Sequence, residues 1–217
     1  MKFDIITIFP KIFDSYFNEG IIGRAKKGGL IEIEAHDLRN WTEDRHKSVD
    51  DRPYGGGPGM VMMVEPIYKA VKAVKSGDDF KKRVILFSAK GRQFDQAEAR
   101  RLTQYEQLIL ICGRYEGVDE RVAENVADEE LSVGNFVLTG GEIPAMILVD
   151  VVSRLIPGVL GKKESLDEES FGKEGSVEYA QYTRPEDFMG WKVPEILLSG
   201  DHKKIAEWRL KNSKLKN

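Results

Sequence analysis

"LILICGRYEGVDERV" (residues 108–122) is the stretch that decides the fold, because its character changes abruptly in the middle. Leu108–Cys112 is a short apolar run that predicts a buried β-strand, and Gly113 ends it. An arginine, a tyrosine and a glutamate follow directly, and then an acidic helix start. In open parallel sheets, ligands bind outside the carboxyl ends of the strands. The stretch therefore predicts a ligand cleft at the end of this strand.

Strand and helix patterns alternate along most of the chain. Further strands are predicted over Phe3–Ile8, Leu30–Ala35, Val84–Ser88 and Asn135–Leu138. Helical periodicity lies over Glu65–Lys75, Asp95–Gln104, Asp119–Val126 and Ile143–Leu155. This alternation predicts an α/β domain with a largely parallel sheet.

The length of 217 residues predicts one large domain, or a large domain with a small appendage. Residues 1–160 carry the α/β pattern, and residues 161–176, "GKKESLDEESFGKEGS", have the composition of a flexible linker or lid. Residues 177–217 are too few to form a core of their own easily. We expect them to form a few helices that lean on the first domain or on a second subunit.

Composition indicates a globular protein, with 41% hydrophobic and 32% charged residues. The single cysteine, Cys112, lies in an apolar run, which favours a buried structural thiol and a reducing compartment. No signal peptide or membrane-spanning run is found, so we expect a cytoplasmic protein that contacts no membrane. The net charge of −3 argues against a general nucleic-acid binder, but residues 201–217 are basic. That tail suits either phosphate contact or a solvated helix face.

Two further stretches are candidates for chemistry. The loop "DDRPYGGGPGMVMMVEP" (residues 50–66) matches neither the Walker A pattern nor GxGxxG, yet its glycines favour a functional loop over a surface turn. The apolar helix after Thr139–Gly141 carries Asp150 and Arg154 four residues apart, on one face. These two charges form either a buried ion pair or an arginine directed at a site, and the cost of burying such a pair favours the second.

Five ordered motifs resemble signatures of the bacterial tRNA (guanine-N1)-methyltransferase family, in the SPOUT class. They are "HKSVDDRPYGGGPGMVM", "LILICGRYEGVDERV", "VLTGGEIPAM", "RLIPGVLG" and "YTRPEDF". The resemblance implies a SPOUT fold with a deep trefoil knot and a small α-helical C-terminal domain that binds tRNA. It also implies S-adenosylmethionine-dependent methylation of N1 of guanosine at tRNA position 37, where a guanosine precedes it. The partners implied are tRNA and a second copy of the chain, in a homodimer with a composite active site.

The resemblance also implies site residues. The methyl donor would be held by Ser88, Gly113, Glu116, Val133, Gly134, Asn135, Phe136, Val137, Leu138, Gly140, Gly141 and Pro144. Asn135 stands where the family often has aspartate. The substrate would be bound by Arg114, Tyr115, Gly59, His46 and Asp50.

Two residues are implied for catalysis. Neutral guanine N1 carries a proton, so a carboxylate must accept it as general base. Glu169 takes this role, because the family usually has aspartate directly before Ser-Phe and this chain reads "DEESF". Asp167 and Glu168 are less favoured candidates. Arg154 would stabilise the negative charge that builds up at guanine O6.

Two other classes of protein compete with this interpretation. A non-catalytic knotted module that binds tRNA or a nucleotide would carry the same motifs. A Rossmann-type methyltransferase would need a glycine fingerprint after the first strand, which is missing. The three histidines show no metal-ligand spacing, so no metal site is predicted. Magnesium is compatible with the reaction, although no motif predicts it.

Overall fold

The computed structural model describes residues 1–75, 81–161, 170–171 and 176–215. The chain forms two compact units, Met1–Gly161 and Lys162–Asn217. Most of the predicted linker, 161–176, lies outside the described residues.

The first unit is built on a five-stranded sheet. Its strands, in spatial order, are β2 (Glu32–Asp37), β1 (Lys2–Thr7), β6 (Gln107–Ile111), β5 (Lys82–Gln93) and β7 (Glu129–Ser132). All four pairings are parallel. The middle residues of β1, β6 and β5 are buried and mostly apolar, because helices cover the sheet on both faces. The α/β class with a parallel sheet is therefore confirmed.

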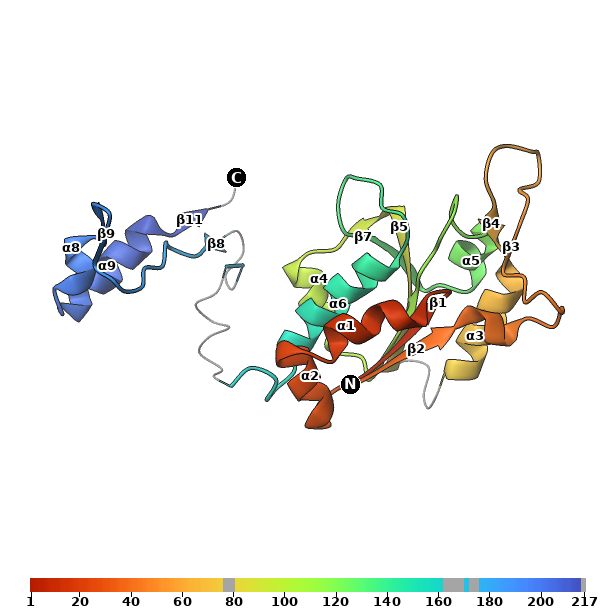
Figure 1. Cartoon of the computed structure of the whole chain (residues 1–217), viewed down its shortest axis with the longest axis horizontal. Coiled ribbons are helices and arrows are strands. Elements are labelled where there is room, and N and C mark those ends of the chain that lie inside the picture. Colours follow the sequence, from red (N-terminus) through yellow and green to blue (C-terminus); the bar gives the residue numbers. More distant parts are fainter. Residues whose placement is uncertain (76–80, 162–169, 172–175, 216–217) are drawn as a thin grey trace. The chain divides into compact units, whose positions relative to one another are not determined.

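Helices lie on both faces of this sheet (Figure 1). They are η1 (Pro10–Phe13), α1 (Asp14–Phe17), α2 (Gly20–Lys27), η2 (Leu38–Trp41), α3 (Val64–Val74), α4 (Gln96–Leu102), α5 (Glu120–Asn125) and α6 (Glu142–Arg154). One core cluster joins α1, α2, α4 and α6 to one face of the sheet, and includes Phe3, Leu110 and Leu148. A second joins α3 and α5 to the other face, and includes Ile109 and Ile67.

The four predicted helices are confirmed within two residues at each end. Two of them begin at an aspartate that caps the first turn. Asp95 accepts a hydrogen bond from the Glu98 amide at 2.8 Å, and Asp119 accepts one from the Arg121 amide at 3.0 Å. These side chains satisfy amides that have no partner inside the helix.

The strand predicted over Asn135–Leu138 is wrong, and so is the expectation that a strand ends at Thr139–Gly141. Phe136 and Val137 are 57% and 90% exposed, and their backbone forms a loop. The strand in this region is β7, immediately before the loop. It pairs with β5 at the edge of the sheet, and its glutamates, Glu129 and Glu130, are partly buried.

Helix α6 is less buried than its apolar sequence predicts. Pro144, Leu148 and Val152 face the core, but Ile143 and Ile147 are 51% and 38% exposed. The first unit therefore presents an apolar helix face that its own residues do not cover.

The glycine-rich stretch forms a hairpin loop between β3 (Asp50–Asp51) and β4 (Val61–Met62). Gly55, Gly56, Gly57 and Gly59 all have positive φ, which side chains rarely adopt. Met62 is buried and fixes the base of the hairpin, because its amide donates to the Gly117 carbonyl at 3.0 Å.

The second unit is small. It contains β8 (Ser176–Val177), β9 (Asp187–Phe188), β10 (Trp191–Lys192), α8 (Glu195–Leu198), α9 (His202–Asn212) and β11 (Lys214–Leu215). The guanidinium of Arg209 lies over the Tyr179 ring at 5.0 Å, and this ring packs edge-on against Trp208. Across the described ranges of both units, none of the helices has the length and apolarity needed to span a membrane.

Candidate active site

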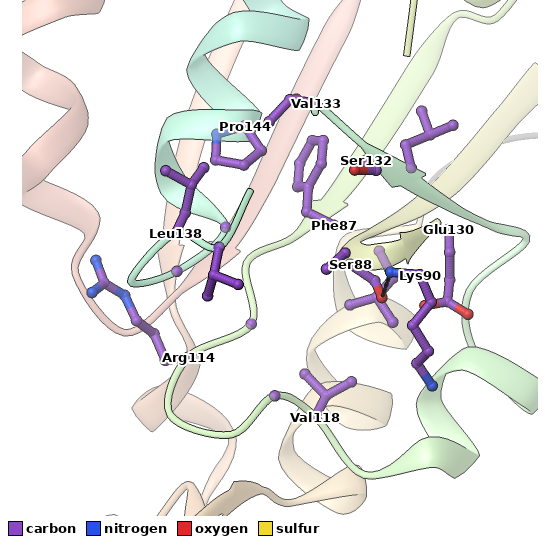
Figure 2. A pocket seen from close by; sticks show the side chains of 18 of the residues that line it. Phe87, Ser88, Lys90, Arg114, Val118, Glu130, Ser132, Val133, Leu138 and Pro144 are labelled. Atoms are coloured by element: carbon purple, nitrogen blue, oxygen red, sulfur yellow. Dashed lines mark hydrogen bonds between the residues drawn. The ribbon is translucent and has the colours of Figure 1, made fainter. Parts of the chain in front are cut away.

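A pocket of about 340 Å³ opens at the carboxyl ends of β5, β6 and β7, where the parallel sheet predicts a ligand cleft. Figure 2 shows two different sides to it. Phe87, Val133, Leu138 and Pro144 lie on an apolar side, whereas Ser88, Lys90 and Glu130 gather on a polar side. All the residues predicted to hold the donor line this pocket, except Asn135, which is exposed.

The polar side depends on an irregularity in β5. The register of β5 against β7 shifts between Phe87 and Arg92, so the intervening residues bulge over the pocket. Ser88 accepts a hydrogen bond from the Lys90 amide at 3.2 Å, which shapes this bulge. The Lys90 ammonium in turn lies 2.6 Å from a carboxylate oxygen of Glu120, and this bond raises the pKa of Lys90.

Glu130 brings an unsatisfied acceptor to the same side. Its Oε2 atom is buried and has no hydrogen-bond partner among the described residues. Such an atom is costly to bury alone. A ligand that donates a hydrogen bond here would remove this cost.

The loop 133–141 follows β7 and lines the pocket. At Gly141 its backbone lies directly against the backbone at the end of β6. A Cβ at Gly141 would lie 2.7 Å from Cys112 Cα, and one at Gly134 would lie 2.8 Å from Cζ of Phe136. Neither glycine has positive φ, so the space and not the conformation requires glycine here. The Gly141 amide donates to the Gly113 carbonyl at 2.9 Å and joins the loop to the end of β6.

Three of the predicted substrate residues meet beside this pocket. Tyr115 has a strained φ of 61°, and its hydroxyl lies near the Asp50 carboxylate of the glycine hairpin. Burial, followed by the Asp50 carboxylate, raises the pKa of Tyr115. Gly59 approaches Glu116 so closely that a Cβ there would lie 2.6 Å from Cγ of Glu116. The hairpin and the end of β6 thus form one continuous surface at the mouth of the pocket.

A strand-end pocket lined by close-packed glycine loops is consistent with the family that the motifs resemble, and sequence comparison decides the point. The profile of the family described as "tRNA (Guanine-1)-methyltransferase TrmD" matches residues 1–217. The chain belongs to this family. The resemblance inferred from the motifs is therefore confirmed.

Curated relatives agree over nearly the whole chain. A protein of Ruminiclostridium cellulolyticum named tRNA (guanine-N(1)-)-methyltransferase is 52% identical over 98% of this chain and 91% of its own length. Proteins of the same name from Dictyoglomus turgidum and Geotalea uraniireducens are each 54% identical, over 98% of this chain and 85% of their own length.

Two other predicted site residues, His46 and Arg154, lie away from this pocket. His46 lies on an exposed turn, where its backbone amide donates a hydrogen bond to the Asp44 carboxylate. His46 does not line the pocket. Arg154 is the last residue of α6, whereas the pocket lies at the first residues of that helix. Glu169, Asp167 and Glu168 lie outside the described residues. Arg114 lines the pocket, but its guanidinium points away from it (Figure 2).

Sequence reasoning missed several polar residues that line the pocket, among them Lys90, Glu120, Glu130 and Ser132. Glu130 and Ser132 were missed because strand β7 was not recognised. In "EELSV", Leu131 and Val133 alternate with Glu130 and Ser132, and this short alternation is a weak strand signal. Lys90 lies two residues after the predicted strand end at Ser88, a position that favours ligand contact.

One cluster of possible metal ligands lies on β1 and β2. Side-chain oxygen and nitrogen atoms of Asp4, Glu34 and His36 lie within 4.8 Å of one another. The Lys2 ammonium already lies 3.1 Å from Asp4 Oδ1 and 3.4 Å from Glu34 Oε2. This lysine supplies the positive charge that the carboxylates need, so the cluster is explained without a metal ion.

Proposed function

We propose that this chain transfers the methyl group of S-adenosylmethionine to N1 of guanosine at position 37 of tRNA, where a guanosine precedes it. The observation that carries the proposal is the strand-end pocket beside the Tyr115–Asp50 pair, in a member of a tRNA (guanine-1)-methyltransferase family. The pocket suits the donor, and the hairpin surface at its mouth suits the guanine.

The pocket residues fit S-adenosylmethionine on two counts. The glycines of the loop leave backbone amides and carbonyls free to approach an adenine edge, and Leu138 and Pro144 offer it an apolar surface. The buried Oε2 of Glu130 accepts a hydrogen bond from a hydroxyl or ammonium group. When bound, the donor supplies an electrophilic methyl group.

The chain itself must remove the N1 proton and stabilise the charge on the base. Glu169 is the proposed general base, and it directly precedes Ser170, which is described. The Ser170 hydroxyl accepts a hydrogen bond from the Glu178 amide at 3.0 Å, so the residue after the proposed base is held in place. Arg154 is the proposed cation for guanine O6.

The contact between the loop 133–141 and the end of β6 supports a SPOUT-type knot. Residues 114 and 140 form an antiparallel bridge, and the Gly141 amide bonds to Gly113. A chain that returns to a strand end in this way has the close loop contact that a deep trefoil knot needs. We propose that the second unit, which contains α8 and α9, is the small C-terminal helical domain of the family.

An uncovered apolar surface supports the proposed homodimer. We call it the α1–α6 face: Phe9, Ile12, Tyr16, Ile143 and Ile147 are each 38–51% exposed. The Tyr16 hydroxyl donates to Asp150 of α6 at 2.5 Å, so the two elements are adjacent. Contiguous apolar surface of this kind marks interaction sites.

The position of Arg154 supports a composite active site. Ile143, Ile147, Asp150 and Arg154 follow one face of α6 at spacings of three and four residues. Arg154 lies ten residues after Pro144, which lines the pocket, and this corresponds to about 15 Å along the helix axis. An arginine on the α1–α6 face, this far from its own pocket, is better placed to act in the pocket of a second copy.

Basic residues support tRNA binding by the second unit. Helix α9 carries Lys203, Lys204, Arg209 and Lys211 against a single glutamate. A cavity beside it is lined by Tyr179, Tyr182, Arg184 and Arg209, which can contact phosphates and stack on bases. Because tRNA is the proposed substrate, we propose the cytoplasm as the location. A magnesium requirement would be shown by a rate of methyl transfer that rises when the metal is added.

Methyl transfer from labelled S-adenosylmethionine tests the proposal. We expect label in a tRNA transcript with guanosine at positions 36 and 37, and none in transcripts with adenosine at position 37. Loss of label when only position 36 is changed would establish the preceding guanosine as a requirement. Binding of tRNA without any transfer of label would instead support the non-catalytic module.

A further inference from the structure

The first residue of α6 is a buried carboxylate that the proposed reaction does not use. The Glu142 side chain is only 1% exposed, and a buried charge is costly unless it is paired and hydrogen-bonded. Its Oε1 accepts from the Thr7 hydroxyl at 2.8 Å, and its Oε2 accepts from Nε of Arg114 at 2.9 Å. The positive end of the α6 dipole favours the carboxylate at this position as well.

The Arg114 guanidinium makes several contacts within the first unit. Besides Glu142, its Nη1 donates to the Thr139 carbonyl at 3.1 Å, and its guanidinium lies over the Phe9 ring at 4.8 Å. The side chain is 19% exposed and points away from Ser88, Lys90 and Glu130 (Figure 2). In this orientation the guanidinium does not reach into the pocket.

These contacts join three segments that are distant in the sequence. Thr7 ends β1, Arg114 follows β6, and Thr139–Gly141 ends the loop that closes the pocket. A Cβ at Gly140 would lie 2.6 Å from Glu142 Oε2, so the loop is in direct contact with the pair. The end of the loop is thereby held against the sheet before any ligand arrives.

We infer that Arg114 and Glu142 are positioning residues for the methyl donor, and that Arg114 does not contact the guanine. The inference rests on the proposed function, because it concerns the loop that would bind S-adenosylmethionine. A loop that is held in its binding conformation loses less entropy on binding, so breaking the pair weakens donor binding. It leaves the guanine surface of Tyr115 and Asp50 intact.

A double-mutant cycle tests this on the full chain without tRNA. Glu142→Gln and Arg114→Gln should each weaken S-adenosylmethionine binding in titration calorimetry by about tenfold or more, the effect of losing one charged hydrogen bond. The double variant should bind about as weakly as either single one, because both changes break the same link. In hydrogen exchange of the free protein, the amides of residues 136–141 should exchange faster in all three variants.

Arg83→Gln is the matched control. It breaks a partly buried ion pair, Arg83 Nε to Glu129 Oε1 at 2.7 Å, at the opposite end of β5. It should lower thermal stability and leave donor affinity within about twofold, since it touches neither the loop nor the pocket. If the Glu142→Gln protein does not fold, the Arg114→Lys variant tests the inference instead. Lysine keeps a positive charge beside Glu142 but cannot reach both Glu142 and Thr139.

Two outcomes would overturn the inference. One is a folded Glu142→Gln or Arg114→Lys protein with wild-type donor affinity and unchanged exchange of the loop. The other is unchanged donor affinity in Arg114→Gln with a raised KM for tRNA at saturating donor, which would make Arg114 a substrate contact. Failure of the proposed donor site is distinct, because then the wild-type chain itself would bind no S-adenosylmethionine, and failure of the proposed catalysis would show only in the transfer of label to tRNA.

Discussion

Gly140 lies against the side chain of Arg114 without room for a side chain of its own. A Cβ at this position would lie 2.5 Å from Cδ of Arg114, well inside contact distance. Its φ is not positive, so any effect of a side chain here would come from this close approach and not from the backbone conformation. A small side chain at Gly140 would therefore be enough to disturb the conformation of the loop 133–141.

Gly140→Val should weaken S-adenosylmethionine binding by about tenfold or more while the sheet stays folded, because the loop must move off the end of β6. Titration calorimetry and circular dichroism measure the two effects. Gly161→Ala is the control, since a Cβ at Gly161 meets nothing within 4 Å and its φ is not positive. Unchanged affinity in a folded Gly140→Val protein would show that the loop does not hold the donor.

Glu169→Gln should lower the single-turnover rate of methyl transfer by about 10²- to 10⁴-fold, the usual contribution of a well-placed general base. The rate must be measured at saturating tRNA and donor, where losses in binding have no effect. Asp167→Asn is the matched control and should have a much smaller effect.

The same two variants distinguish other arrangements. A large loss in Asp167→Asn with little loss in Glu169→Gln would make Asp167 the base. If neither change matters and Arg154→Ala is inactive, solvent accepts the proton and the protein acts mainly by stabilising charge.

Mixing two inactive variants tests the composite site. Arg154→Ala removes the proposed cation, and Ser88→Trp fills the donor pocket. If each site combines the pocket of one protomer with Arg154 of the other, half of the sites in each heterodimer are intact. Random exchange should then restore about a quarter of wild-type activity. A mixture of Arg154→Ala with Arg154→Gln should restore none, and a monomer in sedimentation at assay concentration would refute the arrangement.

Glu129 should make stability depend on pH. Burial raises the pKa of Glu129, but hydrogen bonds from Arg101 and Arg83 outweigh burial and lower it. Its stabilisation is therefore fully present above the unfolded pKa of about 4.3, and is lost as pH falls through the lower folded value. The difference in unfolding free energy between wild type and Glu129→Gln should be constant above about pH 5 and shrink below about pH 4. Denaturant titrations from neutral to acidic pH measure it, and a constant difference would contradict the assignment.

The sequence predicts the parts of the fold that carry a simple period. The apolar runs of β1, β5 and β6 are long enough to be recognised, and the aspartate caps locate α4 and α5. Strand β7 is missed because two of its four residues are glutamates. The apolar run Phe136–Leu138 resembles a strand, but its side chains serve the pocket and the exposed surface instead.

The site is predicted less completely, because it depends on pairs that are far apart in the sequence. The motif places Arg114 at a strand end, but the partner that turns it away from the pocket is Glu142, 28 residues later. Glu130 is indistinguishable from a surface glutamate in the sequence, because only the folded structure buries its Oε2 atom.

The central position of β1 has a consequence for biosynthesis. Its first residue, Lys2, pairs with Glu32 on one side and with Gln107 on the other. On the ribosome, β1 and β2 emerge early, but the second edge of β1 has no partner until β6 has been made. Phe3 and Ile5 of β1 are completely buried in the folded protein, but they lie on a strand whose second edge is still unpaired at this stage. Unpaired apolar strand edges bind other chains, so we expect nascent chains that stop before residue 107 to need a chaperone.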